Sequence, residues 1–324
     1  MNTSQLGTKA MLATLTISIW SARKLDKAAT AKTTTEAGAN ADAARVNKHL
    51  LAGQDAALKA CQTIASAARA EHYRLTLPWN DNGPRILPVS LWKPLNTALQ
   101  TSALTFQAAV DAFLIDYEQA RDRARFSLGA LFSDSDFPSA RKVASKFSFD
   151  FNFENLPDAS DFRAALADDE ADMIRKDMEA RAADRYAAAM RDVWTRLYDA
   201  IQHISTTLPA YDNGNVKRFN DSIIGNLGDL LAILPGLNLT NDPQLSAIAD
   251  RAAAELAGIN PQTLRDDPTA RSRATSSATA ICSTMAGFLG IDRAAAPAPV
   301  VSSTPAQAAP AQVFDLFTAP VRAA

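Results

Sequence analysis

The longest regular apolar pattern in the chain reads Tyr186-Ala-Ala-Ala-Met-Arg-Asp-Val-Trp-Thr-Arg-Leu-Tyr-Asp-Ala-Ile-Gln-His-Ile-Ser-Thr-Thr-Leu208. Its large apolar residues recur every three or four positions, at Tyr186, Met190, Val193, Trp194, Leu197, Ile201, Ile204 and Leu208. This period places them on one face of an α-helix. We therefore expect a long amphipathic helix that begins after Pro157, is capped by Ser160 or Asp161, and ends near Leu208. Its densely charged part, residues 168–185, is expected to be solvated.

The composition also favours helix. Alanine, the best helix former, is the commonest of the 324 residues, whereas glycine, a poor helix former, occurs only 12 times. The 33 lysines and arginines nearly balance the 35 aspartates and glutamates, so the formal net charge is −2. A nucleic-acid coat or a polybasic membrane binder needs a large cationic excess, so the composition argues against both classes.

The helical period recurs on both sides of this segment. Residues 41–72 are predicted to form a helix whose apolar stripe is Leu50, Leu51, Leu58, Cys61, Ile64 and Ala68. Residues 89–132 are predicted to form a second long helix, with the stripe Leu95, Leu99, Phe106, Val110, Phe113 and Tyr117. Shorter helices are expected over 215–234, 243–258 and 262–289, separated by proline- and asparagine-containing turn signals.

Strand patterns separate the first helices. Lys146-Phe-Ser-Phe-Asp-Phe-Asn-Phe-Glu154 alternates phenylalanine with polar residues, and residues 11–20 alternate in the same way. Residues 73–88 carry two short apolar runs around the turn signal 79–84, which predicts a hairpin. We expect these three distant segments to form one small antiparallel sheet.

Together these patterns predict a mainly α protein, with long antiparallel amphipathic helices packed against that sheet. The expected organisation is a strand and helical hairpin with β elements over 1–155, a helical domain over 156–293, and an Ala/Pro-rich flexible tail over 294–324. The tail carries a short apolar motif around Phe314 and Phe317, which is a candidate docking segment for a partner.

The motifs that usually carry catalysis do not occur in the sequence. It contains no phosphate-binding glycine loop, no dinucleotide fingerprint, no His-Glu-x-x-His and no Gly-x-Ser-x-Gly. Cys61 and Cys282 lie far apart among small residues, which indicates two buried apolar residues. We therefore predict a non-enzymatic protein without cofactor or metal. The alternating N-terminal segment resembles neither a leader nor a membrane span, so we expect a protein of the bacterial host cytoplasm.

One basic concentration occurs, formed by Arg121, Arg123, Arg125, Arg141, Lys142 and Lys146. Because Asp122, Asp134 and Asp136 dilute it, the polar side of a helix end is the favoured interpretation. A nucleic-acid contact surface is the alternative, and nucleic acid is an unlikely partner on this composition.

Three stretches carry a family resemblance. They are Leu15-Thr-Ile-Ser-Ile-Trp20-Ser-Ala-Arg23-Lys24-Leu25-Asp26, Phe147-Ser-Phe-Asp-Phe-Asn-Phe153, and Phe219-Asn-Asp-Ser-Ile-Ile-Gly-Asn226-Leu-Gly-Asp229 with Leu234-Pro-Gly-Leu-Asn238-Leu-Thr-Asn-Asp242-Pro243. They resemble an uncharacterised phage and bacterial family, a domain of unknown function often encoded beside MoxR-type AAA+ ATPases and von Willebrand A proteins. The resemblance covers residues 11–260, and implies such an ATPase or von Willebrand A protein as a partner.

The corner formed by Trp20, Arg23, Lys24 and Asp26 is a candidate partner-binding site. The structural alternative is that Trp20 closes the core, that Arg23 and Lys24 are solvated, and that Asp26 caps the next segment.

Three functions follow as hypotheses. The first is a phage or prophage interaction protein, an adaptor or substrate of an AAA+ ATPase. The second is a phage structural or pore-forming-like homo-oligomer, and the third is an accessory of nucleic-acid processing.

Overall fold

The computed structural model describes residues 8–80, 83–157, 168–211 and 220–290. Its strands are β1 (Ala10–Ser18), β2 (Arg23–Leu25), β3 (Asn47–His49), β4 (Leu77–Pro78), β5 (Arg85–Pro88) and β6 (Ser148–Asn155). Its α-helices are α2 (Lys27–Glu36), α3 (Ala56–Leu75), α4 (Val89–Leu128), α5 (Ala140–Ala144), α6 (Asp168–Ala210), α7 (Ser222–Leu237), α8 (Pro243–Ala252), α9 (Pro261–Asp266) and α10 (Pro268–Leu289). The predicted class, mainly α with a small antiparallel sheet, is confirmed.

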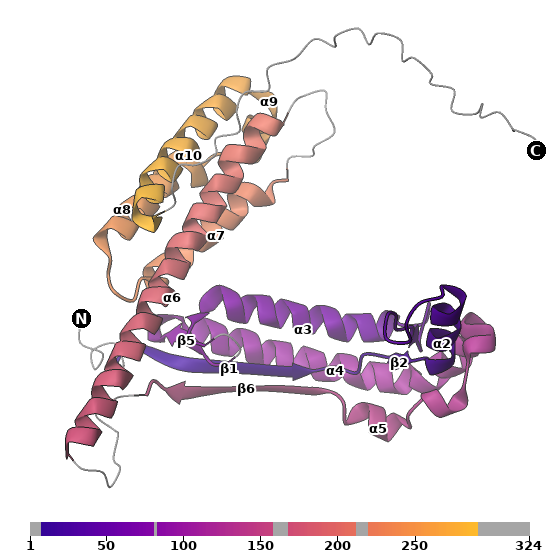
Figure 1. Ribbon diagram of the computed structural model, residues 1–324. Coiled ribbons are helices and arrows are strands. Elements are labelled where there is room, and N and C mark those ends of the chain that lie inside the picture. The colour runs from indigo at the N-terminus through magenta and orange to yellow at the C-terminus, as the bar shows by residue number, and fades with distance from the viewer. Residues whose placement is uncertain (1–7, 81–82, 158–167, 212–219, 291–324) are drawn as a thin grey trace, which may run out of the picture.

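The sheet joins the three distant segments in the order β4-β5-β1-β6, and every pair is antiparallel. β1 pairs with β6 from Met11 opposite Asn155 to Ser18 opposite Ser148. The phenylalanines of β6 pack on α4, where Phe149 lies 5.6 Å from Phe106 and Phe153 lies 6.2 Å from Trp92 between ring centroids. The sheet therefore covers one side of the α3–α4 hairpin, as Figure 1 shows.

The remaining helices form a second group around α6. Figure 1 shows α6 crossing the end of the sheet and continuing beside α7 and α10. Asp242 and Asp267 cap α8 and α10, each followed by a proline at the first helical position. Gly236 brings α7 close to α4, since a β-carbon there would lie 3.0 Å from the side chain of Leu91.

The buried apolar side chains form two clusters. One joins the start of β1, β5 and α4 to α6 and the helices that follow it, with Leu95, Leu197 and Ile201 fully buried. The other fills the far half of the α3–α4 hairpin around Phe113 and Tyr117. α6 contributes to the first cluster along most of its apolar stripe, which confirms its predicted amphipathic face.

The far end of the hairpin carries an ion cluster. The Lys48 ammonium lies 3.2 Å from a carboxylate oxygen of Asp26 and also contacts Asp136, and all three side chains are largely buried. Because both carboxylates favour the charged ammonium, the pKa of Lys48 is raised. The cluster connects the start of α2, β3 and the 3-10 turn Asp134–Asp136.

Several predicted boundaries were wrong. The helix predicted over 41–72 begins at Ala56, because Leu50 and Leu51 are buried in a turn and only imitate the helical spacing. The strand predicted from Tyr73 is limited to β4, because α3 continues to the buried Leu75. Helix α2 and the β2–β3 pair were not predicted.

The predicted 262–289 helix is divided at Asp267 into α9 and α10. The proposed caps Ser160 and Asp161, and the start of the 215–234 helix, lie outside the described residues.

In the described part of the chain, one helix, residues 89–131, is long and apolar enough to cross a membrane by length and composition. A single weakly apolar helix is compatible with the expectation of no membrane span. Its inward face carries buried Phe106, Phe113 and Tyr117, which pack in the hairpin.

Candidate functional site

The two helical groups meet at Thr76, which follows the last turn of α3 and is fully buried. Its carbonyl oxygen accepts hydrogen bonds from Arg196 Nη2 at 2.8 Å and from Arg85 Nη2 at 3.2 Å. Its hydroxyl oxygen accepts from Arg85 Nε at 2.8 Å and donates to the carbonyl of His72. Arg196 belongs to α6 and Arg85 to β5, so one residue fixes three elements.

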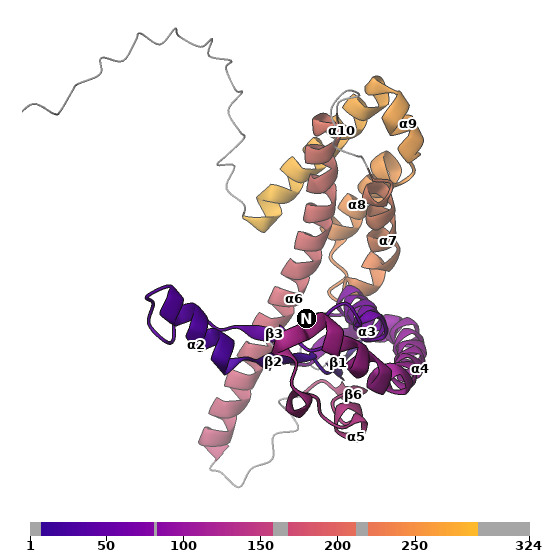
Figure 2. The same cartoon turned by 90° about the vertical axis from the view of Figure 1, so that its right-hand side faces the viewer.

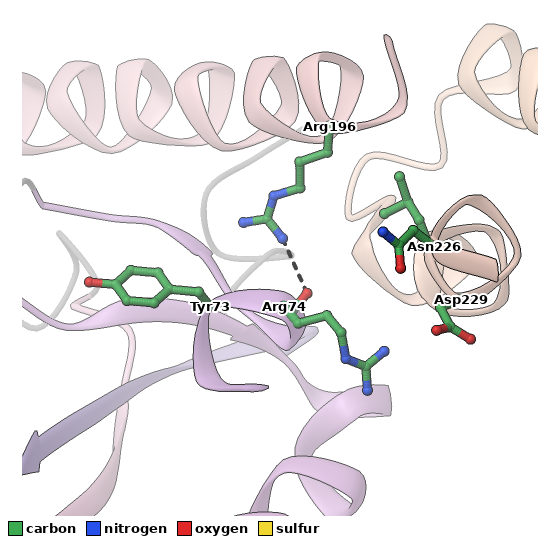
Figure 3. Close-up of a pocket in the computed structure, with 6 residues that line it drawn as sticks. Tyr73, Arg74, Arg196, Asn226 and Asp229 are labelled. Atoms are coloured by element: carbon green, nitrogen blue, oxygen red, sulfur yellow. Dashed lines mark hydrogen bonds between the residues drawn. The ribbon is translucent and has the colours of Figure 1, made fainter. Parts of the chain in front are cut away.

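A cavity of about 440 Å³ opens beside this junction. We call it the α3–α6–α7 cavity; its lining is Tyr73, Arg74, Arg196, Asn226, Asp229 and Leu230. Figure 3 shows Arg196 reaching from α6 to the carbonyl of Arg74, with Asn226 and Asp229 on α7 on the other side. Asn226 and Asp229 belong to the third stretch that carries the family resemblance.

Carboxylates hold the two guanidinium groups of this cavity. Arg74 makes two hydrogen bonds of 2.7 Å to Glu71, which raises the pKa of Arg74. Arg196 lies 2.8 Å from Asp192. Both guanidinium groups are therefore paired with carboxylates, and Leu230 adds an apolar side chain to the lining.

The outward face of α4 carries a second candidate surface. Leu104, Ile115 and Phe126 are 76%, 83% and 89% exposed. We call these three residues the α4 stripe. Their spacing of 11 residues is close to three helical turns, so they lie on one line opposite the buried face. Figure 2 shows α4 at the edge of the α3–α4 hairpin.

The four residues of the predicted corner differ in their burial and contacts. Trp20 is buried in the far cluster, 5.6 Å from Tyr117 between ring centroids. Asp26 accepts a hydrogen bond of 2.9 Å from the backbone of Ala29 and so caps α2. Arg23 and Lys24 are exposed on β2. The corner therefore presents its two cations to solvent, and Trp20 and Asp26 hold it in place.

The six basic residues of the predicted cluster fall into two sets. Arg121, Arg123 and Arg125 each contact carboxylates, of Glu118, Asp116 and Asp134 respectively. Arg141, Lys142 and Lys146 are exposed on α5 and just after it. Pairing to carboxylates reduces the positive potential available for phosphate groups along α4.

The remaining candidates are the two tail phenylalanines, the two cysteines and possible metal ligands. Phe314 and Phe317 lie outside the described residues. Both cysteines are buried, and burial raises the pKa of Cys282 to about 11 and also raises that of Cys61. Over the ranges that the structure describes, no group of three or more His, Cys, Asp or Glu side chains could hold a metal ion.

Comparison with protein-family models, with curated proteins and with solved structures finds no match to this chain.

The sequence did not predict the junction at Thr76, because its acceptor is a backbone carbonyl that no residue pattern reveals. The α4 stripe did have a signal, since apolar residues at an 11-residue spacing fall on the polar side of the predicted helix.

Proposed function

We propose that the protein is a non-enzymatic helical interaction protein, an adaptor whose α4 stripe binds a partner protein. The observation that carries this proposal is the exposure of Leu104, Ile115 and Phe126 on one helical line. Exposed apolar surface marks protein-binding sites when one partner can cover it, and a partner helix laid along α4 would cover these three side chains, which lie about 16 Å apart. Burying each such side chain contributes about 1.5–3 kcal/mol before the costs of association.

The surroundings of the stripe define the chemistry of the partner. Asp111 and Asp122 are exposed and lie seven residues after Leu104 and Ile115, respectively, on the same side of α4. A partner helix with an apolar face flanked by lysine or arginine would complement both features. An AAA+ ATPase of the MoxR type, or a von Willebrand A protein, is the partner that the family resemblance implies, and cytoplasmic action in a bacterial host is part of the same proposal.

A triple variant tests the proposal: Leu104→Gln, Ile115→Gln and Phe126→Gln. Met173→Gln on α6 is the control, since Met173 is also an exposed apolar helix residue, at 67%. Biolayer interferometry would compare both variants with the natural chain against purified MoxR-type and von Willebrand A proteins of the same genome. We expect binding that the triple variant loses and the control keeps. Partner binding that survives the triple substitution would contradict the role of α4.

Self-association is a second candidate function, and one observation favours it. Ile115 lies midway between Leu104 and Phe126, so an antiparallel second copy would place Ile115 on its own equivalent and Leu104 on Phe126. Sedimentation velocity over a range of concentrations separates the two functions. A dimer that the triple variant abolishes supports an oligomer, whereas a monomer that binds the partner supports the adaptor.

A further inference from the structure

A second cavity, of about 310 Å³, lies on the other side of the last turn of α3. We call it the β1-edge cavity; its described lining is Thr14, Leu15, Thr16, Arg69, His72, Tyr73, Asn80, Gly83 and Arg85. It differs from the α3–α6–α7 cavity in charge, because the lining includes two arginines and, among the described residues, no carboxylate.

The cavity forms where strand β5 ends alongside β1. The pairing of β1 with β5 stops at Ala13 opposite Arg85, while β1 continues to Ser18. Side chains of α3 occupy part of this uncovered edge. Arg69 Nη2 donates to the carbonyl of Ile17 at 2.8 Å, and His72 Nε2 lies 3.4 Å from the carbonyl of Ala13.

Those two contacts show which backbone groups face the cavity. The N–H and C=O of one residue point to the same edge of a strand, and alternate residues share that edge. Since the carbonyls of Ala13 and Ile17 point toward α3, the N–H of Leu15 points there too. It lies beyond the last residue of β1 that pairs with β5, so a backbone donor lines the cavity between Arg69 and Arg85.

Arg69 and Arg85 are the two permanently charged side chains among the described lining residues. Within the described ranges, Arg69 donates to a backbone carbonyl, and Arg85 donates to the hydroxyl and the carbonyl of Thr76. Burial lowers the pKa of Arg85 and the nearby charge of Arg196 lowers it further, while the carboxylate of Asp192 opposes this shift. The Tyr73 ring lies 4.5 Å from the Arg85 guanidinium and covers one face of it. An anion in the cavity would stabilise the partly desolvated guanidinium of Arg85 through a charge-assisted hydrogen bond.

We propose that the β1-edge cavity binds an oxyanion, a phosphate or carboxylate group of a small ligand. Arg69, Arg85 and the Leu15 N–H supply donors from three elements, and donors of this type suit planar or tetrahedral oxyanions. Thr14, Thr16 and Asn80 also line the cavity. The cavity shares no lining residue with the α4 stripe.

Isothermal titration with inorganic phosphate and with succinate tests the proposal on the full chain. Sodium chloride at matched ionic strength controls for screening. The test variant is Arg69→Gln, an exposed side chain, and Arg191→Gln, an exposed arginine of α6, is its matched control. Loss of a charge-assisted hydrogen bond is expected to weaken binding about 10- to 100-fold in Arg69→Gln and not in Arg191→Gln. Phosphate binding alone indicates a phosphorylated ligand, and succinate binding alone indicates a carboxylate.

A second measurement locates the ion. In nitrogen-15 NMR titrations, the amide signal of Leu15 is expected to shift with phosphate or succinate, because its N–H faces the cavity. An Arg85→Lys variant, which keeps the charge and loses the planar fork, is expected to weaken binding without removing it. The proposal fails if neither anion binds at concentrations that saturate a millimolar site, or if Arg69→Gln binds as tightly as the natural chain.

Discussion

Burial controls the protonation state of the His72 side chain. It is 5% exposed in the last turn of α3, and desolvation lowers its pKa from 6.5 to about 4. The folded protein therefore keeps this imidazole neutral in a range of pH where the unfolded chain protonates it. At neutral pH the positive charge of the β1-edge cavity accordingly comes from its arginines.

This difference in proton uptake predicts a pH-dependent stability. Below pH 6.5 the unfolded state binds more protons at His72 than the folded state does, so the free energy of unfolding falls as the pH decreases toward 4. The loss attributable to His72 is about 3 kcal/mol. Urea unfolding of the natural chain and of His72→Gln across this range would measure it. We expect the stability difference between the two proteins to shift in favour of His72→Gln at pH 4; a constant difference would contradict the assignment.

Asp242 illustrates how elements are fixed to one another. Its Oδ1 atom accepts from the backbone N–H groups of Gln244 and Leu245 at the start of α8, at 2.9 and 3.4 Å. Its Oδ2 atom accepts from the indole N–H of Trp194 at 3.2 Å. One carboxylate thus caps α8 and attaches it to α6.

Asp242→Ala is expected to destabilise the fold by about 2–3 kcal/mol. The lost cap contributes about 1 kcal/mol, and the indole N–H left without its acceptor contributes the remainder. Asp242→Asn retains an acceptor for the cap and should lose less. Chemical denaturation followed by tryptophan fluorescence would rank the three proteins; equal stability of all of them would show that the carboxylate does not fix α8.

The helices and strands differ in how well their local sequence predicts them. The stripe of α6 and the alternating phenylalanines of β6 made both predictable, because each buries one face along its whole length. Helix α2 buries only Thr34 and therefore lacks an apolar period. Its formation depends on the Asp26 cap and on the ion cluster at Lys48, a contact between segments far apart in the chain. The β1-edge cavity depends on where β5 stops, which pairing decides and local sequence does not.

At the scale of the molecule, Arg196 couples the α6–α10 group to the hairpin. It donates to the carbonyls of Arg74 and Thr76 and lies against Asp192. Gly236 on α7 provides a second close approach, to Leu91 on α4. The two groups are therefore joined by these contacts as well as by an apolar cluster. We call the contacts of Arg196 and Gly236 the seam.

Arg196→Gln should loosen this seam. We expect a loss of about 1–3 kcal/mol, since Thr76 keeps only one of its two arginine donors and Asp192 loses its cation. Hydrogen exchange should accelerate most in the last turn of α3 and in β4. Arg191→Gln, on the exposed side of the same helix, should change neither stability nor exchange, and uniform acceleration across the whole chain would contradict a local seam.

The bond between Arg196 and Thr76 also sets an order of events during synthesis. The two residues are 120 positions apart. At ribosomal rates of about 5–20 residues per second, Thr76 leaves the ribosome roughly 6–24 s before its partner. For that interval the nascent hairpin exposes Leu75 and Leu77, which α6 helps to cover in the finished fold. The chain is therefore most exposed to aggregation and chaperone binding between the completion of α4 and the emergence of α6.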